Sequence, residues 1–95
     1  SGQLALQIEM PMGAELDDDV FARAKEVLEA HPGTAPVELR LGSDNGITVP
    51  VFRSRTLKAD PSRDTIEALQ KMFGKARVRL VRVGQTLGEA GPGTR

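Results

Sequence analysis

Residues 26–41 read Glu-Val-Leu-Glu-Ala-His-Pro-Gly-Thr-Ala-Pro-Val-Glu-Leu-Arg-Leu, which predicts a helix, a turn and a strand in succession. Pro32 lacks the N–H that a continuing helix needs, and it disfavours helical angles at His31. We expect Gly33 to close the turn with a positive φ, and His31 to bond the free carbonyls at the helix end. From residue 37 to residue 41 apolar and charged side chains alternate, so one face of the predicted strand is apolar.

The chain before this turn predicts one strand and the body of the helix. In residues 4–10 a large apolar side chain occupies every second position, which is typical of a half-buried strand. Three aspartates precede the helix. We expect Asp17 to be the N-cap and the other two to lie in the first turn, where the helix dipole favours negative charge. The helix then carries an apolar stripe at helical spacing, made of Val20, Phe21, Ala24, Val27, Leu28 and His31.

The chain after the turn predicts a hairpin. The Asn-Gly pair at residues 45–46 is a strong signal for a tight hairpin turn. We expect the third strand to contain the alternating Ile47, Val49 and Val51. Pro50 should then lie at a sheet edge or a bulge, because proline has no N–H for the ladder.

A second helix and a last strand complete the pattern. Asp60 is the expected N-cap, with Pro61 at the first helical position, and Gly74 is the expected C-terminal cap. Between these caps an apolar stripe is made of Thr65, Ile66, Leu69, Met72 and Phe73. Residues 78–83 predict the last strand.

The element order β-α-β-β-α-β predicts an α+β domain of the split βαβ, ferredoxin-like kind over residues 4–83. We expect a four-stranded antiparallel sheet with both helices on one face and right-handed crossovers. The opposite face should carry polar side chains, namely Gln7, Glu9, Glu38, Arg40, Thr48, Arg77 and Arg79. We interpret residues 1–3 as the remnant of a cleaved tag, and the Gly-rich residues 84–95 as a disordered tail.

Composition narrows the class of protein. The 95 residues carry no net charge, but residues 1–47 hold nine acids and three bases, and residues 48–95 hold four acids and ten bases. We therefore expect an acidic and a basic side. Zero net charge argues against a general polyanion binder, and three Phe without Trp or Tyr leave little for base stacking. With no Cys and no apolar run near the roughly 20 residues of a membrane span, we expect a cytoplasmic chain without disulfides.

The sequence shows no recognisable catalytic, metal or cofactor site. Capping and dipole roles account for the aspartates at 17–19, which do not converge on one point as ligands of Mg²⁺ would. His31 is the only histidine, and no partner for acid–base or nucleophilic catalysis stands at a recognisable spacing from it. We therefore expect no catalytic activity, no metal and no cofactor in this chain.

Several motifs stand in a particular order. Phe-Ala-Arg-Ala-Lys-Glu-Val-Leu-Glu-Ala-His-Pro-Gly at 21–33 precedes Pro-Val-Glu-Leu-Arg-Leu at 36–41, and Leu-Lys-Ala-Asp-Pro-Ser follows at 57–62. A short helix then ends in Phe-Gly, before Val-Arg-Leu-Val at 78–81. Over residues 4–82 this order resembles the extreme C-terminal region of bacterial DNA polymerase III alpha subunits. Two departures are the Thr-Leu-Lys-Ala at 56–59, where that family often has Tyr or Phe-Arg-Val, and the Gly-rich tail.

The resemblance implies a non-catalytic accessory domain, because the catalytic carboxylates of that polymerase family lie in another part of the parent chain. In the family this region follows an oligonucleotide-binding fold and contacts the tau subunit of the clamp loader. The implied partners are therefore tau and other parts of the polymerase holoenzyme, although no tau-contact residue carries over by motif. From the predicted sheet face and basic edge, we expect the contact surface to contain Arg40, Arg53, Arg55, Arg77 and Arg79.

Two other classes of function stay open. The first is a nucleic-acid-binding module that guides single-stranded DNA, which requires the basic side chains to gather on one concave face. The second is a small-ligand regulatory domain of the ACT type, which has the same element order. That domain would form a dimeric sheet with an interfacial pocket near residues 10–15.

Overall fold

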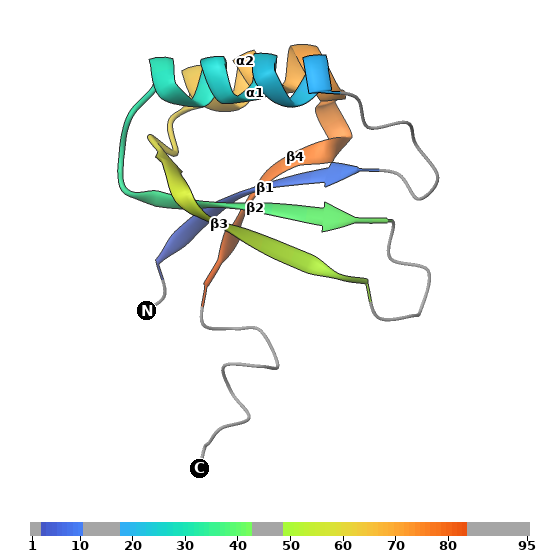
Figure 1. Cartoon of the computed structure of the whole chain (residues 1–95). Coiled ribbons are helices and arrows are strands. Elements are labelled where there is room, and N and C mark those ends of the chain that lie inside the picture. The colour runs from blue at the N-terminus through green and yellow to red at the C-terminus, as the bar shows by residue number, and fades with distance from the viewer. Residues whose placement is uncertain (1–2, 11–17, 43–48, 84–95) are drawn as a thin grey trace.

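In the computed structural model the chain forms two layers, a four-stranded sheet with two helices packed on one of its faces (Figure 1). The structure describes residues 3–10, 18–42 and 49–83. The elements are β1 (Leu4–Met10), α1 (Asp18–Ala30), β2 (Ala35–Leu41), β3 (Val51–Ala59), α2 (Arg63–Phe73), the 3-10 turn η1 (Lys75–Arg77) and β4 (Val78–Arg82). The α+β class and the predicted order of strands and helices are thus confirmed.

The sheet is mixed, in the order β3-β2-β1-β4. β1 and β2 are neighbours and run parallel, whereas β3 and β4 pair antiparallel with them at the two edges. The predicted antiparallel sheet would need β3 between β1 and β2, so an ordinary βαβ unit replaces the split one. Burial gives the physical reason. β1 is buried on both faces, whereas β3 is largely exposed and carries three cations, which suits an edge strand.

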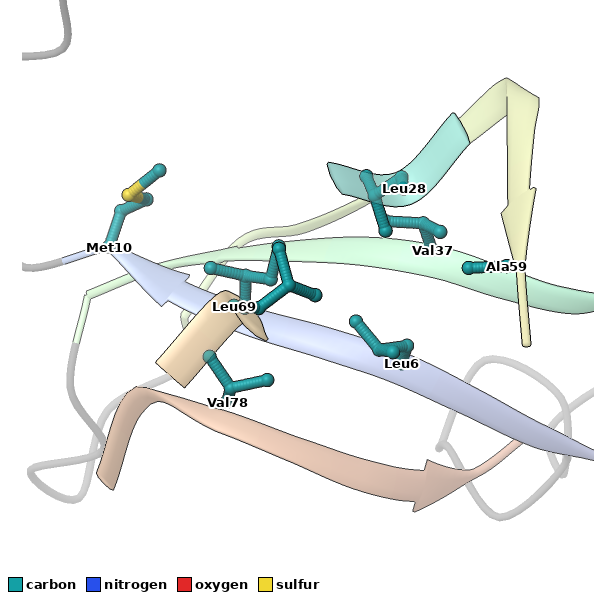
Figure 2. Packing of buried hydrophobic residues seen from close by; sticks show 8 residues of the cluster. Leu6, Met10, Leu28, Val37, Ala59, Leu69 and Val78 are labelled. Carbon is teal, nitrogen blue, oxygen red and sulfur yellow. The ribbon is translucent and has the colours of Figure 1, made fainter. Parts of the chain in front are cut away.

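The core lies between the sheet and the helices. Figure 2 shows Leu6 and Val78 of the sheet converging with Leu69 of α2. The buried residues of this core are Leu6, Ile8, Met10, Leu28, Val37, Ala59, Leu69 and Val78. Burying one Leu side chain of this kind contributes about 1.5–3 kcal/mol to the stability of the fold.

The His-Pro-Gly turn after α1 contacts the chain at Asp60, just before α2. His31 Nδ1 lies 2.9 Å from the carbonyl oxygen of Val27, which confirms the predicted closure of the helix by this side chain. Gly33, in contrast, lacks the predicted positive φ. Glycine is required there because a Cβ would lie 2.5 Å from the Cα of Asp60. The Asp60 N–H also donates to the carbonyl of His31 at 2.8 Å.

The caps of α2 match the prediction at one end only. Ser62, rather than Asp60, is the N-cap, and its hydroxyl accepts a hydrogen bond from the Thr65 N–H at 3.5 Å. The helix begins at Arg63, so the cap position falls on Ser62, two residues after Asp60. At the other end Gly74 is the cap, as predicted, with φ 107° and its N–H donating to the Gln70 carbonyl at 2.8 Å.

β3 lies later in the chain than predicted. It begins at Val51 and runs to Ala59, beyond the expected strand around Ile47 and Val49. Pro50 stands just before it, and the Leu41 N–H donates to the Pro50 carbonyl at 2.9 Å. The predictions for Asp17, for the Asn-Gly turn, for Thr48 and for both chain ends (residues 1–2 and 84–95) concern residues outside the described ranges.

Candidate functional site

The sheet face opposite the helices carries an ordered array of polar side chains, because charged residues alternate with apolar ones along the strands. The strand register aligns one row across all four strands, made of Arg79, Gln7, Glu38 and Arg53. In the next row Glu9 pairs with Arg40. We call these six residues the polar sheet face.

Glu38 is the centre of the polar sheet face. It is only 5% exposed. Its carboxylate accepts hydrogen bonds from Gln7 Nε2 at 3.1 Å and from Arg53 Nη2 at 2.8 Å. A buried carboxylate without such partners would be strongly disfavoured, so these two partners allow an acidic residue in the middle of the sheet.

A second ion pair occupies the other half of the face. Arg79 Nη2 donates to Glu9 Oε1 at 2.7 Å. The arginines at the two ends of the central row, Arg53 and Arg79, are therefore each bound to a glutamate of the same face. Any ligand that needs these guanidinium groups must compete with carboxylates already in place.

The structure brings together some of the predicted contact residues and separates others. Arg40, Arg53 and Arg79 share the polar sheet face. Arg55 lies further along β3 and is exposed, while Arg77 lies in η1, where its N–H donates to the Gly74 carbonyl at 3.1 Å. The five arginines thus do not form one continuous basic surface.

An apolar pocket lies on the helix side of the sheet, between α1 and β3. Its volume is about 240 Å³, and ten of its fourteen lining residues are apolar. The chain's three aromatic residues, Phe21, Phe52 and Phe73, all line it. Two of them are unusually open for large apolar side chains, because Phe52 is 57% exposed and Phe21 is 41% exposed. We call this feature the Phe pocket.

A bulge in β3 shapes one wall of the Phe pocket. Phe52 and Leu57 are five residues apart, so a regular strand would place them on opposite faces. Ser54 Oγ accepts hydrogen bonds from the N–H groups of Leu57 at 2.9 Å and Thr56 at 3.3 Å, and the register with β2 shifts at the same place. The bulge inverts the alternation beyond it, so that Phe52 and Leu57 both line the pocket. β3 changes direction along its length accordingly (Figure 1).

Sequence reasoning did not identify the Phe pocket. It assigned Phe21 and Phe73 to the apolar stripes of the two helices, which are normally core. The available signal was Phe52, a large aromatic residue directly before the charged run that starts at Arg53. A large aromatic residue beside a run of charged ones on an edge strand is a candidate for an exposed apolar position, although the sequence does not show that Phe21 lies next to it.

Other kinds of site find little support in the described ranges. No group of three His, Cys, Asp or Glu side chains is arranged there to hold a metal ion. In the same ranges no helix is long and apolar enough to cross a membrane. The chemistry that the Phe pocket itself offers is burial of apolar surface, with Lys25 as a cation on its α1 side.

Neither a scan against models of known protein families nor a search of curated proteins gives a match for this sequence. The function is therefore argued from the geometry of the two surfaces just described.

Proposed function

We propose that this chain is a protein-interaction domain that binds a partner protein through the Phe pocket. The observation that carries the proposal is the exposure of Phe21 and Phe52 at the rim of a preformed apolar pocket. Exposed apolar patches on small soluble domains mark interaction sites, and buried aromatic anchors dominate the binding energy of such interfaces. Covering the exposed parts of these two rings removes apolar surface from water, which is the main favourable contribution to such an association.

The resemblance in the sequence suggests which assembly this domain serves. We infer a non-catalytic accessory domain from the C-terminal end of a bacterial replicative DNA polymerase, acting in the cytoplasm. Its partners are then the tau subunit of the clamp loader and other parts of the holoenzyme. The order of the motifs at 21–41, 57–62 and 78–81 supports this inference.

The polar sheet face favours a protein over a nucleic acid as partner. Arg53 and Arg79 are held by Glu38 and Glu9, so a phosphate bound there would face two carboxylates. All three aromatic residues line the Phe pocket on the opposite side of the sheet, so none is available on this face to stack on bases. The ACT-type alternative depended on a split βαβ sheet, and the parallel pairing of β1 with β2 removes that argument.

An NMR titration distinguishes these functions. The ¹⁵N-labelled chain is titrated with a C-terminal fragment of tau, and separately with single-stranded DNA, at two salt concentrations. We expect tau to shift the amides of α1 and β3 around the Phe pocket at both salt concentrations. Shifts produced by DNA alone, confined to the polar sheet face and lost at the higher salt, would assign the domain to DNA instead. If the tau fragment causes no chemical-shift changes, the assignment to the polymerase is wrong.

A further inference from the structure

We propose that the Phe pocket receives an extended, acidic segment of a partner protein, which adds to β3 as a fifth strand of the sheet. This inference rests on the proposed interaction function and specifies the chemistry of the partner. Three observations carry it: the free backbone edge of β3, the position of the pocket along that edge, and the charge of the strand.

The register fixes which backbone groups of β3 face outward. The Leu41 N–H donates to the Pro50 carbonyl, so these two residues form a hydrogen-bonded pair of the antiparallel ladder. Such pairs alternate with non-hydrogen-bonded ones, and Val51 and Arg53 therefore turn their N–H and C=O groups away from β2. β3 is the last strand of the sheet on that side. An incoming strand thus meets two donors and two acceptors at these residues.

The Phe pocket lies where the side chains of an added strand would point. Phe52 stands between the two outward-facing residues, and its own side chain lies on the helix face, beside the pocket. A strand paired with β3 lies about 4.8 Å beyond it and sends every second side chain to that same face. An apolar residue opposite Phe52 would cover its exposed ring and extend toward Phe21. The ladder then supplies affinity and the pocket supplies selectivity.

The charge of β3 identifies the partner as acidic. The strand holds Arg53, Arg55 and Lys58 and no acidic residue. Within the described ranges Arg55, Lys58 and the pocket residue Lys25 make no ion pair, since the ion pairs found there involve other side chains. A second copy of this chain is a poor occupant, because pairing β3 with itself sets cations against cations. In a segment that alternates Asp or Glu with large apolar residues, the carboxylates would pair with the cations of β3 and the apolar side chains would enter the Phe pocket.

Selection from a library of random dodecapeptides displayed on phage, against the full chain at physiological salt, tests the chemistry. We expect the enriched peptides to be acidic, with apolar residues at every second position. Enriched peptides with apolar residues three and four apart, with net positive charge, or no enrichment at all would overturn the proposal.

Hydrogen exchange then tests the binding mode, with a synthetic copy of the most enriched peptide as probe. Binding should slow amide exchange at Val51 and Arg53 and leave Phe52 unchanged, because the Phe52 N–H already faces β2. Methylating the peptide nitrogens at one set of alternate positions should abolish binding, and at the other set should leave it intact. The ring resonances of Phe52 report separately on the pocket. A peptide that shifts these ring resonances without slowing amide exchange at Val51 and Arg53 would refute strand addition while leaving the interaction function standing. A peptide that leaves the ring resonances of Phe52 unchanged would count against both.

Two variants complete the test. Arg55→Glu should lower the affinity for the acidic peptide about three- to tenfold, because the attraction between the exposed Arg55 and the peptide's carboxylates becomes a repulsion. Thr56→Ala changes the neighbouring exposed side chain without changing charge, and it should bind as the unmodified chain does. Equal affinities for all three proteins would show that the charge of β3 does not select the partner.

Discussion

Gly33 lies where the turn after α1 passes the junction between β3 and α2. A Cβ at this position would lie 2.5 Å from both the Cα and the N of Asp60, and 2.7 Å from the carbonyl carbon of Ala59. These neighbours are backbone atoms that cannot rotate away. The need for glycine therefore comes from a close approach and not from the angle φ.

Gly33→Ala should lower the free energy of unfolding by about 1–3 kcal/mol, the usual cost of forcing a group into packed surroundings. Urea denaturation followed by circular dichroism measures the change. Thr34→Ala is the matched control in the same turn. Thr34 is exposed, and Gln3 donates a hydrogen bond to its backbone carbonyl, which the substitution retains. Equal midpoints for Gly33→Ala and the unmodified chain would show that the turn can move away from Asp60.

Glu38 illustrates how a single side chain depends on its partners. Arg53→Met should destabilise the fold by about 1–3 kcal/mol, because it leaves the buried Glu38 carboxylate with Gln7 as its remaining partner among the described residues. The value stays below that of a fully buried pair, since the Arg53 side chain is 44% exposed.

A double-mutant cycle isolates this interaction. Adding Glu38→Gln to Arg53→Met should recover part of the lost stability, because the charge that Arg53 neutralised is gone. The same cycle on Glu9 and Arg79 is the comparison, and we expect a smaller coupling there because Glu9 is less buried than Glu38. Additive effects at Glu38 and Arg53 would contradict the role given to this ion pair.

Among the secondary-structure elements, β3 shows where sequence reasoning stops. The periodicity of β1 and of both helices is local, so their positions could be read from alternation and spacing. β3 contains a bulge held by Ser54 Oγ, and beyond it the alternation is inverted. Its edge position also depends on how much burial β1 and β2 gain by pairing with each other, which is a non-local property. The same two features create the Phe pocket, so the sequence did not reveal it.

Ser54→Ala should remove the acceptor for the Leu57 N–H and cost about 1 kcal/mol of stability. It should also shift the NMR resonances of Phe52 and Leu57 together, because both lie on the wall that the bulge builds. Thr56→Ala is the control, since its exposed hydroxyl makes no hydrogen bond within the described ranges. If the NMR resonances of Phe52 and Leu57 are unchanged in Ser54→Ala, backbone geometry alone maintains the bulge.

Across the whole molecule, the opposite charges of the two halves of the chain are interleaved in the sheet. Glu9 and Glu38 stand among Arg40, Arg53 and Arg79, so the expected acidic and basic sides do not separate on this face. The outer part of β3, in contrast, carries Arg55 and Lys58 and no acidic residue. Such charges protect an open sheet edge from pairing with a second copy.

Replacing the two cations of β3 that make no ion pair within the described ranges, in Arg55→Val with Lys58→Val, should therefore promote self-association of the domain. Analytical ultracentrifugation over a concentration series measures it, with the unmodified chain expected to remain a monomer. Lys71→Val with Lys75→Val is the control, because it removes the same charge from exposed positions away from β3. A monomeric double variant of β3 would show that another feature closes this edge.

The most direct test of the interaction function compares two substitutions on one strand. Phe52→Ala removes an aromatic side chain of the Phe pocket, whereas Val51→Ala removes an exposed apolar side chain from the opposite face of β3. Calorimetric titration with the tau C-terminal fragment should show affinity reduced about tenfold or more by Phe52→Ala and nearly unchanged by Val51→Ala. Equal affinities for the two variants and the unmodified chain would contradict binding at the Phe pocket.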